Sequence, residues 1–197
     1  GNLNGDGSLG IFEGYLSTIT PDGRQAQSIV RRSDCIAESG MPLAFGGTVL
    51  GQPSDAAIGA KLLDYCHFTS ALRKGERADP AHGAYGLVGW GLNSPAWYGP
   101  NYGDDNARVL LATMAGAALL KQSRYDEPML LCLLANLRTT GQLGFRERSI
   151  TVADLGKHGW RYYFRRHNTD FAPHYQAYLW SCFLWAGHQT GFELFRQ

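Results

Sequence analysis

Charged residues are scarce in this chain of 197 residues, and the two signs nearly balance. Asp, Glu, Lys and Arg make up 18% of the residues, and the formal net charge is +1. A nearly neutral chain has no long-range field that would gather a phosphate backbone or an anionic membrane surface. We therefore expect neither a nucleic acid nor a membrane as its partner.

Long apolar runs are also missing. The longest uncharged apolar stretch, from Val109 to Leu120, has twelve residues, whereas a membrane-spanning helix needs about 20. This stretch is predicted to be a buried core helix. No basic segment followed by an apolar one opens the chain, so the sequence shows no signal peptide, and its localisation stays unknown.

The cysteines lack the spacing of a zinc site or a redox motif. Cys35, Cys66, Cys132 and Cys182 form no Cys-x-x-Cys pair, and the six histidines are scattered along the chain. We predict free thiols that behave mostly as small buried apolar side chains, which is compatible with a cytoplasmic protein. No metal site is expected from the histidines and cysteines.

What the chain does contain is glycine, with 25 residues, and aromatic side chains, at 12%. The composition is too apolar for a disordered chain, and the length fits one domain over residues 1–197. That domain is either complete or a piece of a longer protein. Residues 1–24 predict a β-hairpin or turn segment closed at Pro21-Asp22-Gly23.

Residues 25–197 are predicted to be all-α and to form helical hairpins. Helices are expected over residues 26–45, 54–74, 104–122, 126–139 and 173–191, with no type assigned to 152–166. Pro42 is expected to kink or break the first of them. The helices over 104–122 and 126–139 are apolar nearly all round, which indicates an inner layer in an α/α-hairpin architecture.

One pattern near the start resembles a calcium loop. Asn2, Asn4, Asp6 and Glu13 match most ligand positions of such a loop, but the only carboxylates are those of Asp6 and Glu13, and no helix precedes them. Calcium prefers several anionic oxygens. A Gly/Asn-rich turn is therefore favoured, and no cofactor is expected.

The strongest signal is the acidic pair Asp104-Asp105, which opens an apolar helix after the aromatic, glycine-rich loop 75–103. One explanation is structural, with Asp104 capping the helix and Asp105 in its first turn. Two adjacent carboxyl groups, however, tend to separate their pKa values, which suits an acid beside a nucleophile or base. Their carboxyl groups could lie about 5 Å apart, as in a retaining glycosidase.

The run Asp104-Asp105-Asn106-Ala107 resembles the Asp-Asp-Asn-Ala motif of six-hairpin (α/α)6-toroid glycosidases, notably the endo-α-1,6-mannanases. The stretches 79–82 and 171–180 are closer to uncharacterised members of that group. The resemblance implies a glycoside hydrolase with Asp104 as nucleophile and Asp105 as acid/base. Gly103 and Arg108 depart from the family pattern, in which Tyr precedes the pair and Trp follows Ala.

Several residues are candidates for binding an oligosaccharide or other glycan. Aromatic faces suit sugar rings, and polar groups near the pair suit hydroxyls. Asp34 and Glu38 share a helical face, which requires compensation by Arg31 or Arg108, or a polar site that both residues line. The candidate substrate-binding residues are Trp90, Tyr98, Tyr102, Arg108, Glu38 and His174.

Two other functions stay open. The domain could bind carbohydrate or act as a scaffold without catalysis, or it could be a sugar epimerase or isomerase that uses His174 with a second histidine. A complete (α/α)6 toroid is longer than this chain. The resemblance thus implies part of a toroid, completed by flanking sequence or by a homo-oligomer, or a smaller array of hairpins.

Overall fold

The computed structural model describes residues 5–167 and 170–196, and these residues are mostly helical. The prediction of a largely helical domain with a small N-terminal β element is confirmed. Within the described residues the α-helices are α1 (Ser33–Val49), α2 (Pro53–Asp64), α3 (Pro95–Tyr98), α4 (Gly103–Leu120), α5 (Asp126–Leu137), α6 (Val152–His158), α7 (Trp160–Phe164) and α8 (Pro173–Thr190). None of these helices is long and apolar enough to cross a membrane.

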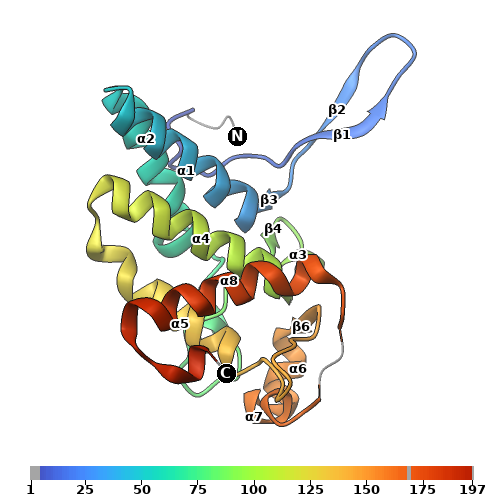
Figure 1. Ribbon diagram of the computed structural model, residues 1–197. Coiled ribbons are helices and arrows are strands. Elements are labelled where there is room, and N and C mark those ends of the chain that lie inside the picture. Colours follow the sequence, from blue (N-terminus) through green and yellow to red (C-terminus); the bar gives the residue numbers. More distant parts are fainter. Residues whose placement is uncertain (1–4, 168–169, 197) are drawn as a thin grey trace.

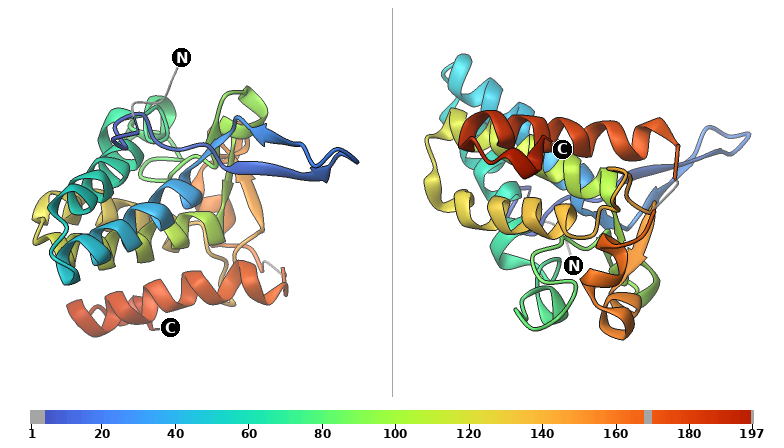
Figure 2. Two further views of the ribbon diagram at one scale, coloured as in Figure 1. Left: turned by 90° about the horizontal axis from the view of Figure 1, so that it is seen from above. Right: turned by 60° about the horizontal axis from the view of Figure 1, so that its bottom comes forward.

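In the part of the chain that the structure describes, six short strands pair into three antiparallel two-stranded sheets. They are β1 (Gly14–Ile19) with β2 (Gln25–Ser28), β3 (Arg31–Arg32) with β4 (Gly91–Leu92), and β5 (Pro100–Tyr102) with β6 (Ser149–Thr151). The β1–β2 hairpin projects from the helical body (Figures 1 and 2). The expected boundary at residue 24 thus falls inside the hairpin, and the part after it is not purely helical.

Helix α4 forms the middle of the helical body, with α1 on one side and α8 on the other (Figure 1). Its buried residues Ala107, Val109 and Leu110 join Ile36 of α1 and Leu179 of α8 in the main apolar core. The prediction of an inner apolar helix is confirmed for residues 104–122, whereas α5 leaves Leu130 and Leu134 exposed and is not covered on every side. All four cysteines are free, and Cys66, Cys132 and Cys182 are buried, also as predicted.

The backbones of helices α1 and α2 approach each other closely because glycines lie at their contact. A Cβ at Gly47 would lie 2.3 Å from the backbone nitrogen of Ala56, and one at Gly59 would lie 2.7 Å from that of Ala44. The prediction that Pro42 breaks this segment is wrong, since α1 continues to Val49. Packing along both α2 and α4 holds the helix together despite the missing hydrogen bond.

Other boundaries differ from those predicted. The first helix begins at Ser33 instead of residue 26, because the chain first completes β2 and β3. The second α-helix ends at Asp64 and passes into a π-helical turn, Tyr65–Thr69. Residues 152–166 form α6 and α7, and a 3-10 turn, Glu193–Phe195, follows α8.

Candidate functional site

The acidic pair lies where two short strands pass directly into helices. β3 ends at Arg32 and leads into α1, while β5 ends at Tyr102 and leads into α4. The backbone of Trp90 joins these two junctions. Its carbonyl accepts a hydrogen bond from the Ser33 N–H at 3.0 Å, and its N–H donates to the Pro100 carbonyl at 3.2 Å. The first turns of α1 and α4 are therefore held side by side.

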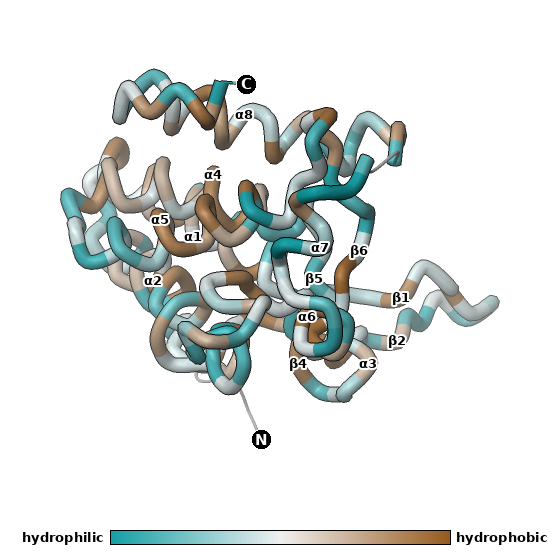
Figure 3. The backbone as a smooth tube through the Cα atoms, turned by 90° about the horizontal axis from the view of Figure 1, so that it is seen from below, coloured by the Kyte–Doolittle hydropathy of each residue, from teal (hydrophilic) through white to brown (hydrophobic). Residues whose placement is uncertain are grey.

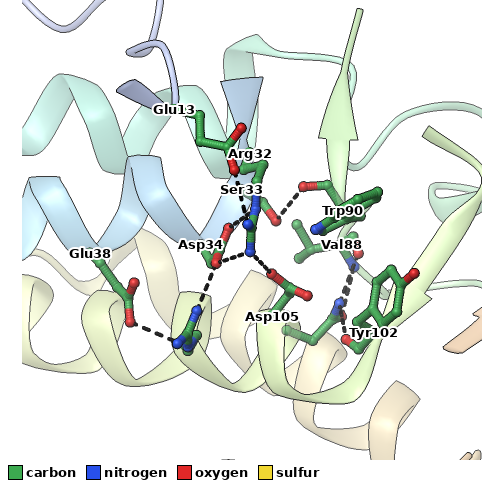
Figure 4. A network of polar contacts seen from close by, with 11 residues as sticks. Glu13, Arg32, Ser33, Asp34, Glu38, Val88, Trp90, Tyr102 and Asp105 are labelled. Carbon is green, nitrogen blue, oxygen red and sulfur yellow. Dashed lines mark hydrogen bonds and ion pairs between the residues drawn. The ribbon is translucent and has the colours of Figure 1, made fainter. Parts of the chain in front are cut away.

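Arg32 connects the carboxyl groups of these two turns (Figure 4). Its Nη2 donates to Asp34 Oδ2 at 2.6 Å and to Asp105 Oδ1 at 3.0 Å, and its Nη1 reaches Glu13 Oε1 at 3.1 Å. A second guanidinium, that of Arg108, donates to Asp34 Oδ2 at 2.9 Å. Asp34 is fully buried and Asp105 is 4% exposed, so both carboxyl groups depend on these contacts.

We call this group the acidic cluster. It contains five carboxyl groups and two guanidiniums, those of Glu13, Asp34, Glu38, Asp104, Asp105, Arg32 and Arg108. Acids outnumber bases, so a proton on one carboxyl group would relieve the repulsion. In the described part of the chain, no group of three or more His, Cys, Asp or Glu side chains is arranged to hold a metal ion.

Within the acidic cluster, the surroundings of Asp105 favour the protonated form. Burial, followed by the charge and hydrogen bond of Asp34 and the charge of Asp104, raises the pKa of Asp105 to about 8. At Asp34, burial opposes ionisation, but the hydrogen bond with Asp105 and the Arg32 guanidinium outweigh it and hold its pKa below the usual value. A neutral acid and an ionised carboxylate thus stand next to each other at neutral pH.

Asp104 faces a different environment on the same turn. It is half-buried, and its Oδ1 is shielded from solvent with no hydrogen-bond partner among the described residues. Burial raises the pKa of Asp104, while hydrogen bonds from the backbone N–H groups of Asp105 and Asp104, followed by the charge of Arg108, act in the opposite direction. The alternative prediction of Asp104 as a helix cap is wrong, because the N-cap is Tyr102 and no side chain caps α4 within the described chain.

A row of aromatic rings runs past the start of α4. Trp97 stacks on Trp90 with ring centroids 4.1 Å apart, Trp90 meets Tyr102 edge-on at 5.1 Å, and Tyr102 stacks on Tyr175 of α8 at 6.4 Å. The Arg32 guanidinium lies 5.5 Å from the Trp90 ring centroid, which joins this row to the acidic cluster. All four rings are partly exposed. We call them the aromatic row.

The remaining predicted residues are brought together only in part. Glu38 is exposed, and its Oε1 lies 3.6 Å from Arg108 Nε. Arg108 also pairs with Asp34, which confirms it as a base that compensates these two acids. The other predicted base, Arg31, does not take this role, and Arg32 pairs with Asp34 instead. His174 is exposed, with its ring centroid 4.1 Å from that of Tyr175.

Tyr98 lies away from the acidic cluster and the aromatic row. It donates a hydrogen bond to the Lys74 carbonyl at 2.8 Å and packs against the buried Arg77. The end of the loop 75–103 thus folds back onto its beginning and gives Tyr98 a structural role. No local pattern in the sequence reveals this contact.

The residues of the suggested calcium loop have other partners. Asp6 accepts hydrogen bonds from Ser8 and pairs with Lys61 at 2.8 Å. Glu13 joins the acidic cluster through Arg32. Asn2 and Asn4 lie outside the described residues.

Sequence reasoning missed Arg32 as the central base and Asn106 as the anchor of the loop. The Asn106 side chain accepts from the Val88 N–H at 2.9 Å and donates to the Val88 carbonyl at 2.8 Å, which fixes the loop two residues before Trp90. The adjacent pair Arg31-Arg32 was a usable signal for Arg32, since consecutive residues of a strand point to opposite faces and only one of the two can meet α4.

The chain was compared with protein-family models, with curated proteins and with solved structures, and none of the three comparisons gave a match.

Proposed function

We propose that this protein is a carbohydrate-active domain of the glycoside-hydrolase type, with Asp104 and Asp105 as its reacting pair. The observation that carries the proposal is the neutral Asp105 beside the ionised Asp34 and next to Asp104, at the start of a helix bordered by aromatic rings. Glycosidic cleavage needs one carboxyl group that holds a proton at the working pH and one that does not.

In this mechanism Asp104 attacks the anomeric carbon while Asp105 protonates the departing glycosidic oxygen. The bond from the sugar to that oxygen breaks, and a covalent bond to the Asp104 carboxylate forms. Asp105, now ionised, then accepts a proton from the water that displaces Asp104, and this restores both groups. Burial raises the pKa of Asp104, and the charge of Arg108 opposes that shift, which favours the ionised form that the attack requires.

The aromatic row supplies a surface for the substrate. Apolar faces of sugar rings stack on flat aromatic side chains, and Trp90 and Tyr102 are partly exposed within reach of the acidic cluster. The proposal includes the finer architecture, in which the hairpins α1–α2 and α4–α5 are units of an α/α toroid, with the closing units in flanking sequence or a second copy.

The test is a panel of oligosaccharides that differ in sugar and linkage and include α-1,6-linked mannosides. Cleavage is followed by the appearance of anomeric proton signals in NMR spectra, which also report retention or inversion. We expect cleavage of at least one member and its loss in Asp104→Asn. The matched control is Asp126→Asn, because Asp126 is an exposed acid in the first turn of α5, outside the acidic cluster. Equal turnover by wild type and Asp104→Asn would refute the nucleophile assignment.

A second candidate is a domain that binds carbohydrate without cleaving it. The observation that favours it is the 4% exposure of Asp105, whose carboxyl group accepts a hydrogen bond from Arg32. This candidate predicts sugar binding that Trp90→Ala abolishes, with no product from any substrate. The epimerase alternative has less support, because it requires two histidines as acid and base. Among the described residues, His174 is the only histidine that contributes to the pKa shifts of Asp104 and Asp105.

A further inference from the structure

An apolar groove lies between α5, α7 and the turn after α8, and none of its lining residues belongs to the acidic cluster. Its volume is about 540 Å³, which is in the range of pockets that hold small organic molecules. Leu134, Phe164, Phe192 and Leu194 line it and remain between 37% and 48% exposed. Figure 3, which colours the backbone by residue hydropathy, shows hydrophobic stretches along α5 and α8.

Three arginines surround this apolar surface. They are Arg138 at the end of α5, and Arg161 and Arg165 on α7. Across residues 5–167 and 170–196, no carboxylate oxygen lies within 4.0 Å of a side-chain nitrogen of any of the three. The neighbouring Arg166 differs, since it pairs with Glu147 at 2.5 Å. The groove therefore carries positive charge that the described part of the protein does not neutralise.

Two of these guanidiniums converge on one aromatic ring. Arg161 lies 4.6 Å and Arg138 5.9 Å from the Trp160 ring centroid. The Nε of Arg138 is buried and has no hydrogen-bond partner among the described residues, and burial lowers the pKa of this group. Two like charges close to one ring repel each other, and an anion bound beside them in the groove would reduce that repulsion.

We propose that this groove binds a small organic anion with an apolar body, such as a medium-chain alkyl carboxylate. The apolar part lies against Leu134, Phe164 and Leu194, and the carboxylate is held by Arg161 and Arg165, the two exposed arginines of the groove. Guanidinium and carboxylate match in a bidentate geometry, which favours this head group over a neutral one. A second copy of the chain fits less well, because a self-complementary contact would bring the three arginines against their own counterparts.

The test uses decanoate, decanol and decyltrimethylammonium, each below its micelle concentration, with binding followed by tryptophan fluorescence. Loss of the signal in Trp160→Phe locates the response in the groove. We expect decanoate to bind at least roughly tenfold more tightly than decyltrimethylammonium, as one charge-assisted hydrogen bond provides. Arg161→Glu and Arg165→Glu should weaken decanoate binding by a similar factor and reverse the order of the two charged probes.

The matched control is Arg24→Glu, which makes the same change of charge on the projecting hairpin, at an exposed residue. It should leave both affinities unchanged. Absence of decanoate binding, equal binding of the two charged probes, or equal effects of Arg24→Glu and Arg161→Glu would overturn the proposal. A dimer in light scattering that Arg161→Glu dissociates would assign the groove to a second copy, and would overturn it as well.

Discussion

Replacing Asp105 by Asn should change how the stability of the protein depends on pH. The folded protein holds the Asp105 proton up to a pKa of about 8, whereas the unfolded chain releases it near the usual value of 3.8. Between these values the folded state binds one more proton than the unfolded state, so the free energy of unfolding falls as pH rises. One proton corresponds to about 1.4 kcal/mol per pH unit.

The wild type should therefore lose on the order of 3 kcal/mol between pH 5 and 7 relative to Asp105→Asn, whose amide has no proton to release. The hydrogen bonds to Arg32 and Asp34 can be kept, since an amide both accepts and donates. Burial, followed by the charge of Arg73, lowers the pKa of His67 to about 3, which makes stability fall toward acid pH. That contribution is present in both proteins and cancels in their difference.

The assay is urea denaturation followed by tryptophan fluorescence at pH 5, 6 and 7. We expect the stability difference between Asp105→Asn and wild type to grow steadily with pH. A difference that stays constant over this range would mean that Asp105 is already ionised in the folded protein. The assignment of Asp105 as a proton-holding acid would then be refuted, together with the mechanism that depends on it.

Four further substitutions test the structural basis of the site and the packing of α1 on α2. Arg32→Met should lower the free energy of unfolding by about 2–3 kcal/mol in urea denaturation, because it leaves two buried carboxyl groups without their shared base; an unchanged value would contradict the central role of Arg32. Asn106→Leu should cost about 1–3 kcal/mol by the same assay, since it leaves the Val88 backbone unpaired. Gly47→Ala should destabilise by about 1–3 kcal/mol, because its Cβ would meet backbone at 2.3 Å. At Gly46, where no atom lies within 4 Å of such a Cβ, the same change should stabilise by up to about 1 kcal/mol; equal effects at the two glycines would contradict the close packing of α1 and α2.

The sequence predicted the long helices well because their apolar residues recur at helical spacing and their ends carry local signals. Pro173 begins α8, and Gly191 follows its last residue in a left-handed conformation. Pro42 was misinterpreted because its local preference for ending a helix is outweighed by packing along α2 and α4, which depends on residues far away in the chain.

The site was predictable only where its residues are adjacent. Asp104 and Asp105 stand together in the sequence, and Asp34 and Glu38 share a helix face, so local patterns identify them. The contact of Arg32 with Asp105 joins residues 73 positions apart through the short β3–β4 pairing. Two-residue strands carry no detectable periodicity, and this is why the central base was missed.

The central claim is that Asp104 and Asp105 together cleave a glycosidic bond. The most direct measurement is the initial rate of product release from one cleaved oligosaccharide, compared among wild type, Asp104→Asn and Asp126→Asn at equal concentrations of folded protein. Our account predicts a loss of roughly 1000-fold or more in Asp104→Asn, as for the removal of a catalytic nucleophile, with Asp126→Asn unchanged. A rate in Asp104→Asn within a factor of about two of wild type would contradict it.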